Sequence, residues 1–100
     1  MTYSDPTERA ALIGGFRELA DYLESNPEVP APRYPVIYTF PPDGDWPAMR
    51  AEISTIAASL GVIARETSGG HYVATRFFGP VEYRAVAIPP KNDSGNQESE

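Results

Sequence analysis

The chain has 100 residues and no cysteine, with a formal net charge of −6 and a pI near 4.6. This length predicts a single domain, and the lack of cysteine excludes disulfides and thiolate metal sites. The negative charge disfavours a protein that neutralises nucleic-acid phosphates. No apolar run approaches the roughly 18 residues of a membrane span, and the first residues do not resemble a secretory signal. We therefore expect a cytoplasmic protein with neither a membrane nor a nucleic-acid partner.

The first predicted element is a helix that begins after Asp5. Asp5 can accept a backbone N–H as the N-cap, Pro6 suits the first helical turn, and Glu8 completes the spacing of a capping box. Apolar side chains then recur at i, i+4, i+7 and i+11, namely Leu12, Phe16, Leu19 and Leu23. The motif Ser25-Asn26-Pro27 ends this amphipathic helix.

Gly14 and Gly15 interrupt the helical pattern, and each costs roughly 1 kcal/mol relative to alanine in a helix interior. A well-supported helix can tolerate such a pair. The pair can also break the helix, or it can form a flat patch on which a second backbone, such as that of another subunit, packs closely. The residues alone leave these alternatives open.

Residues 26–35 (NPEVPAPRYP) hold four prolines and form the next segment. Proline fixes φ and disfavours helix in the residue before it, so we predict a stiff, extended connector. A ligand for a proline-binding groove is the other interpretation, which the need to join two packed elements disfavours.

The remaining elements predict the fold class. We expect strands at 36–40, 62–67, 71–78 and 81–88, and a second helix from the cap Asp45 to Gly61. The order α-β-α-β-β-β predicts an α+β fold, a two-layer sandwich with two helices packed on one face of a four-stranded, mostly antiparallel sheet. Residues 36–67 would be a β-α-β unit whose two strands can be parallel. Residues 1–88 would form a single domain that includes the connector, and 89–100 would be disordered.

Side-chain alternation predicts the two faces of the last three strands. Two-residue turns would pair Ser68 with His71 and Phe78 with Val81, which places Val73 and Phe77 beneath the helices. An open face would then hold Arg65, Tyr72, Arg76, Phe78 and Tyr83. Neighbouring arginines favour a nearby anion or partner, and Arg with Tyr is enriched in interface hot spots. A solvated face is the alternative, and a one-residue shift at Gly79-Pro80 would re-sort the last strand.

No pattern of catalytic or metal-binding residues is present. His71 is the only histidine and has no cysteine or triad spacing beside it. Asp43 and Asp45 fit turn and capping roles better than a calcium loop, and the glycine pairs do not form a phosphate-binding fingerprint. We expect no enzymatic activity, no cofactor and no metal.

The segments LADYLESNPEVPAPRY and GHYVATRFFGPVEYRAVAIP resemble a group of small proteins from actinobacteria and their phages or integrated elements. The resemblance covers residues 13–90. No activity is established for that group, so the resemblance implies context alone: a small cytoplasmic accessory protein, with a mobile element as one source of its gene.

Together these features predict a non-enzymatic interaction module. It would contact a protein partner or a second copy of itself through the open face or through a sheet edge. The alternative is a protein that binds a small molecule or an anion, such as a nucleotide or phosphate, with the same five residues.

Overall fold

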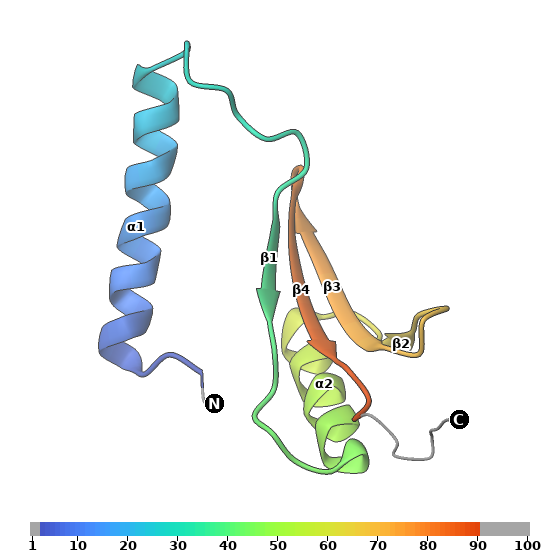
Figure 1. The fold of residues 1–100 in the computed structure, drawn as a ribbon. Helices are drawn as coiled ribbons and strands as arrows, with labels where there is room; N and C mark the ends of the chain where they lie inside the picture. The colour runs from blue at the N-terminus through green and yellow to red at the C-terminus, as the bar shows by residue number, and fades with distance from the viewer. Residues whose placement is uncertain (1–2, 91–100) are drawn as a thin grey trace.

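The computed structural model describes residues 3–90, and its elements follow the predicted order. They are α1 (Pro6–Ser25), β1 (Val36–Thr39), α2 (Trp46–Leu60), β2 (Arg65–Glu66), β3 (Tyr72–Phe78) and β4 (Val81–Ala87), drawn in Figure 1. The predicted α+β class, with two helices and a four-stranded mixed sheet, is confirmed. The disorder predicted for 89–100 lies, beyond Pro90, outside the described residues.

Local chemistry sets the ends of both helices as predicted. The carboxylate of Asp5 accepts the N–H of Glu8 at 2.8 Å, and the Glu8 carboxylate accepts the N–H of Asp5 at 2.9 Å, which is a complete capping box. Asp45 accepts the N–H of Ala48 at 2.9 Å. Gly61 ends α2 in the left-handed conformation, with φ of 73°.

The sheet has the strand order β1-β4-β3-β2. β1 runs parallel to β4, and the other two pairings are antiparallel. β1 and β2 therefore run in the same direction, but they lie at opposite edges of the sheet. Consequently the edge of β1 that faces away from β4 has no neighbouring strand within the described residues.

The turn between β3 and β4 has the predicted register. Phe78 pairs with Val81 across Gly79 and Pro80, and Gly79 adopts φ of 60°. This positive φ explains why glycine occupies the first position of a two-residue hairpin loop. The order of side chains along these two strands is thus as predicted.

The predicted register between β2 and β3 is wrong by one residue. The connecting loop holds three residues, 68–70, because the N–H of Thr67 bonds the carbonyl of His71 at 2.7 Å. Gly70 adopts φ of 84° and closes the loop by donating to the Thr67 carbonyl at 2.9 Å. Arg65 consequently pairs with Val73, and a one-residue shift moves every side chain of β2 to the other face.

The core lies between α2 and the β3–β4 pair, on the face that the sequence predicted to be open. Ile53 and Ala57 of α2 are 0% and 3% exposed. They pack with three alanines of the strands, Ala74, Ala85 and Ala87. Small side chains let the helix approach the strands closely, so this face accepts α2 although it carries less apolar bulk than the face of Val73 and Phe77. The predicted assignment of the two faces is therefore wrong.

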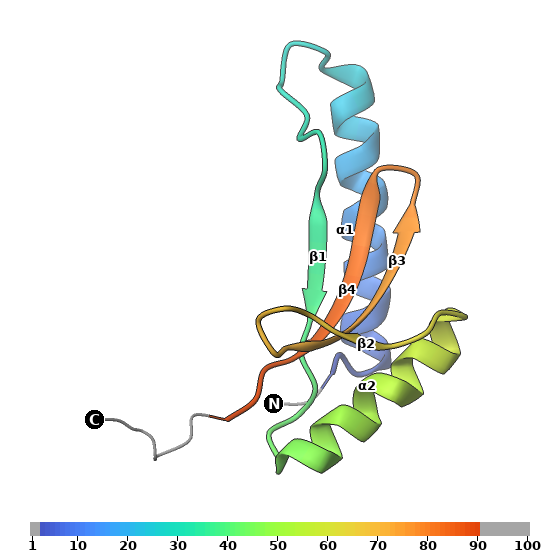
Figure 2. The ribbon, with the colours of Figure 1, turned by 90° about the vertical axis from the view of Figure 1, so that its right-hand side faces the viewer.

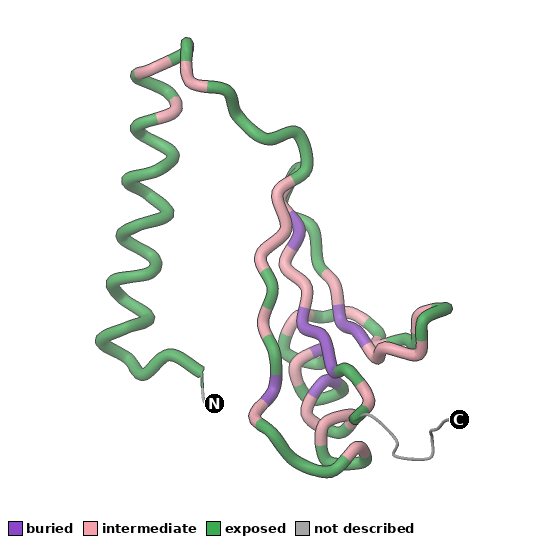
Figure 3. The backbone as a smooth tube through the Cα atoms, viewed as in Figure 1, coloured by how far each residue is buried: buried purple, intermediate pink, exposed green. Residues whose placement is uncertain are grey.

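The first helix does not pack on the sheet. No residue of α1 is buried, and within the described residues α1 contacts no other helix or strand. Figures 1 and 2 show α1 standing beside the strands, joined to β1 by the proline-rich connector, and Figure 3 shows its exposure along nearly its whole length. The connector is not extended throughout as predicted, because residues 26–29 form a turn closed by the N–H of Val29 and the carbonyl of Asn26 at 2.9 Å. Of the two helices predicted to cover the sheet, only α2 does so, because the proline-rich connector leads the chain away from the sheet.

Candidate interaction surface

The five residues predicted to share an open face are separated by the fold. Tyr72, Arg76, Phe78 and Tyr83 lie on the face that α2 occupies, since they alternate with the strand residues that point away from it. Arg65 lies on the opposite face, beside Val73. The predicted Arg65–Arg76 neighbourhood is therefore wrong, and with it the argument that two adjacent arginines need an anion.

Tyr72 is covered by side chains of α2. The Arg50 guanidinium lies 4.1 Å from the centre of the Tyr72 ring and 5.7 Å from that of Trp46. The Tyr72 hydroxyl lies 3.4 Å from the Ser54 hydroxyl. These contacts pack the ring against α2 with a cation–π interaction, so Tyr72 has a structural role that the sequence did not predict.

Arg76 binds the end of the same helix. Its Nη1 donates to the carbonyl oxygen of Leu60 at 3.0 Å, and its guanidinium lies 5.2 Å from the centre of the Phe78 ring. The last carbonyls of a helix carry a partial negative charge and have no partner within the helix. Arg76 thus supplies a donor where α2 needs one.

A shallow hollow of about 520 Å³ lies beside α2. Its lining residues are Trp46, Pro47, Arg50, Ala51, Ser54 and Tyr72. Arg50 is its one charged group, and Nη1 of Arg50 already lies 3.6 Å from the Glu66 carboxylate. The hollow therefore offers a ligand little unpaired charge.

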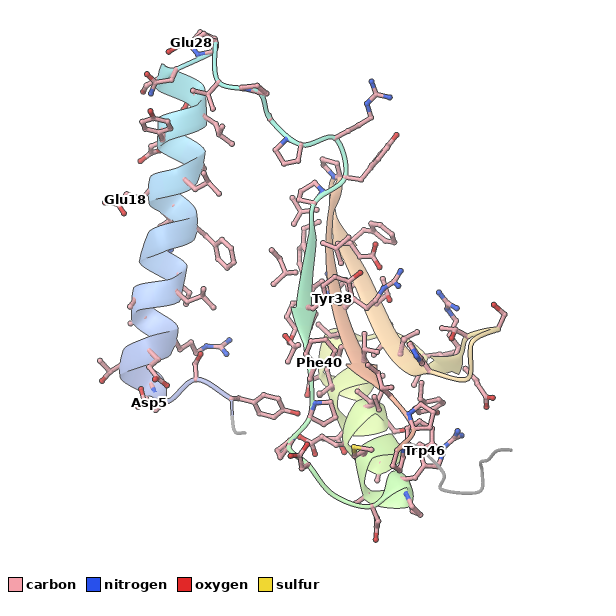
Figure 4. All side chains as sticks on the ribbon, in the orientation of Figure 1. Asp5, Glu18, Glu28, Tyr38, Phe40 and Trp46 are labelled. Atoms are coloured by element: carbon pink, nitrogen blue, oxygen red, sulfur yellow. The ribbon has the colours of Figure 1, made fainter. Side chains whose placement is uncertain are left out.

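Three aromatic side chains lie on the face away from α2. Tyr38 and Phe40 stack with ring centres 6.1 Å apart, and both are labelled in Figure 4. Tyr38 pairs with Arg84, and Phe77 pairs with Glu82, so the register places these side chains on one face. Tyr38, Phe40 and Phe77 are 55%, 52% and 61% exposed. We call this surface, with Glu82 and Arg84, the aromatic face.

The charges of the aromatic face cancel. Nε of Arg84 lies 2.6 Å from the Glu82 carboxylate, and Glu82 is only 8% exposed. A partly buried ion pair of this kind leaves the surface aromatic and nearly neutral. The sequence analysis missed this face because it assigned Phe77 to the core. Tyr38 and Phe40, just before the PPDGD turn, were the residues that could have indicated it.

A second apolar surface runs along α1. Leu12, Phe16 and Leu19 are 51%, 43% and 55% exposed, and with Leu23 they form what we call the apolar stripe. Figure 4 shows Glu18 pointing away from the sheet. Phe16 lies about 160° around the helix from Glu18, because successive residues are separated by about 100°. The apolar stripe is therefore turned toward the sheet without touching it.

One hydrogen bond joins the start of the chain to α2. The hydroxyl of Tyr3 donates to the Glu52 carboxylate at 3.1 Å. Partial burial, followed by the hydrogen bond and negative charge of Glu52, raises the pKa of Tyr3 from 10.0 to about 12. Tyr83 also contributes to this shift, so the start of α1 lies on the α2 side of the sheet.

Residues 3–90 contain no group of three His, Cys, Asp or Glu side chains that could hold a metal ion. The backbone N–H of His71 donates to the Thr67 hydroxyl at 3.2 Å, which fixes the hairpin loop. In that same part of the chain, neither helix is long and apolar enough to cross a membrane.

No protein-family model, curated protein or solved structure matches this chain. The resemblance to small actinobacterial and phage proteins stays a prediction, and the surfaces of the molecule carry the functional argument.

Proposed function

We propose that this protein is a non-enzymatic, cytoplasmic interaction module that binds another protein through its aromatic face. The observation that supports the proposal is the exposure of Tyr38, Phe40 and Phe77, each above one half, on a sheet face that α2 does not cover. Aromatic residues are enriched in the centres of protein interfaces, where charged residues are depleted.

The chemistry of the aromatic face favours a protein over other partners. Arg84 is paired with Glu82 at 2.6 Å, and Arg65, on the same side of the sheet, lies on β2 at the edge opposite β1. The aromatic face itself therefore lacks the clustered positive charge that phosphate groups require. The outer edge of β1 lies next to Tyr38 and pairs with no strand among residues 3–90, so its backbone groups can pair with an extended segment of a partner. An anion-binding function has less support, since the fold separates Arg65 from Arg76.

Site-specific photocross-linking tests the proposal. A benzophenone amino acid replaces Tyr38 in the protein expressed in its native cells, and a matched variant carries it at Tyr22. The two tyrosines are equally exposed at 55%, but Tyr22 lies on α1. We expect a discrete cross-linked protein at position 38 alone. No product at position 38, or the same products at both positions, would contradict the function.

A further inference from the structure

The apolar stripe of α1 has no partner within the described residues of its own chain. Amphipathic helices in globular proteins bury such a stripe, because packing rather than helix propensity supplies most of their stability. The stripe of α2, by comparison, buries Ile53 and Ala57 completely or nearly so. A 20-residue helix with two internal glycines and no packing would be marginally stable.

The sheet has room for a second helix on the face that α2 occupies. α2 contacts β3 and β4 but not β1, and Figures 1 and 2 show it against the end of the strands far from the β3–β4 turn. The part left uncovered carries Ile37, Phe78, Val81 and Tyr83, which we call the helix-free surface. This surface spans β1, β4 and β3, and strands lie about 4.8 Å apart, so its width matches the roughly 10 Å that one packed helix occupies.

The connector keeps the two halves of this contact apart within one chain. Residues 26–35 include Pro27, Pro30, Pro32 and Pro35, which restrict the backbone, and they begin with a turn in which the N–H of Val29 donates to the Asn26 carbonyl at 2.9 Å. Exchange of an identical element between two copies is a low-cost route to a dimer, and within the described residues α1 contacts no other helix or strand that would have to be given up.

We propose that two copies of this chain form a dimer in which the apolar stripe of each α1 packs on the helix-free surface of the other copy. Each copy then donates one helix and receives one, as two-fold symmetry requires. The chain itself contains both halves of the interface, so a second copy is the partner that its surfaces fit.

The distribution of charge favours this arrangement over a pair of α1 helices packed on each other. The helix and its cap carry five carboxylates and two arginines, a net charge of −3, so two α1 helices repel one another. The helix-free surface has Arg76 beside Tyr83 at its margin. The negatively charged α1 should therefore pack more favourably on the helix-free surface than on a second α1 helix.

The exposed area of the chain agrees with an unfilled interface. In a single copy, Leu12, Phe16 and Leu19 of the apolar stripe stay 51%, 43% and 55% exposed, and Phe78 of the helix-free surface stays 54% exposed. The Tyr3–Glu52 bond at 3.1 Å is exposed and can form between copies instead.

Engineered cysteines test the exchange, because the natural chain contains none. Two single variants, Leu19→Cys on the apolar stripe and Ile37→Cys on the helix-free surface, carry tags of different mass. They are mixed, unfolded in urea, refolded together and oxidised. We expect a covalent heterodimer of the two variants, and light scattering of the wild type at twice the mass of one chain.

Matched variants make each outcome decisive. Glu18→Cys, which points away from the sheet, replaces Leu19→Cys as the control and should give no heterodimer. Thr39→Cys, on the same face of β1, replaces Ile37→Cys if that variant does not fold. A monomeric wild type, a disulfide closed within the Leu19→Cys/Ile37→Cys double variant, or homodimers of Leu19→Cys as abundant as the heterodimer would each overturn the exchange. None of these results bears on the aromatic face.

Discussion

Arg76 and Leu60 join β3 to the end of α2 through a hydrogen bond of 3.0 Å from a guanidinium nitrogen to a main-chain carbonyl oxygen. The sequence analysis predicted that Arg76 is available to bind a partner or ligand. In the structure its guanidinium instead donates a hydrogen bond to the carbonyl oxygen of Leu60. A side chain that ends a helix in this way stabilises the packing of helix on strand and is less free to bind a partner.

Replacing Arg76 tests that role. We expect Arg76→Met to lower the free energy of unfolding by about 1 kcal/mol, because the carbonyl loses its hydrogen bond while the aliphatic part of the side chain remains. Urea denaturation measures the change. Arg65→Met, at an exposed position on the opposite face, is the control and should alter stability little; equal losses in both variants would argue against the helix-end role.

Overpacking tests the closeness of α2 to the strands. Ala57 is 3% exposed against Ala74 and Ala85, whereas its neighbour Ala58 is exposed. We expect Ala57→Leu to cost about 1–3 kcal/mol of stability, since extra methylene groups in a packed core force backbone or rotamer shifts. Ala58→Leu should stay within about 0.5 kcal/mol of the wild type. Thermal unfolding of the two variants compares them, and a tolerated leucine at position 57 would contradict the observed packing.

Glycine substitutions separate two kinds of backbone position. A Cβ at Gly14 or Gly15 meets nothing within 4 Å, so Gly14→Ala and Gly15→Ala should each stabilise α1 by about 1 kcal/mol. The gain should slow amide hydrogen exchange in α1. Gly61 also has open space but adopts φ of 73°, so Gly61→Ala should destabilise the protein by roughly 1 kcal/mol. Slower association of Gly15→Ala with its copy would instead favour a close backbone contact at that glycine.

The hydroxyl of Tyr3 should lose its proton at a higher pH than an ordinary tyrosine. Its folded pKa of about 12 lies above the usual value of 10.0, so the fold favours the protonated hydroxyl. The resulting stabilisation is complete below pH 10 and is lost as the pH rises through 12. We expect the absorbance of tyrosinate to show a late step that disappears in Tyr3→Phe and moves to lower pH in Glu52→Gln. A late step that persists in Tyr3→Phe would assign it to another tyrosine.

The sequence by itself determined the order of the elements and the ends of the two helices, whereas the strand predicted at 62–67 is paired only over Arg65–Glu66. Asp5, Glu8, Asp45 and Gly61 act through hydrogen bonds and backbone angles that involve only near neighbours in the chain, so their roles could be predicted without the fold. The turn at Gly79-Pro80 was predictable for the same reason. The order of elements then fixed the α+β class.

Only the tertiary structure decided which face of the strands is covered. Val73 and Ala74 are both buried at 1% exposure although they point to opposite faces, so alternation could not tell the two faces apart. The preference for the alanine face comes from the fit of α2, a contact between residues far apart in the chain. A single extra residue in the loop after Thr67 moved Arg65 away from Arg76. Within the described residues α1 contacts no other helix or strand, so no packing pattern in the sequence could have predicted its position.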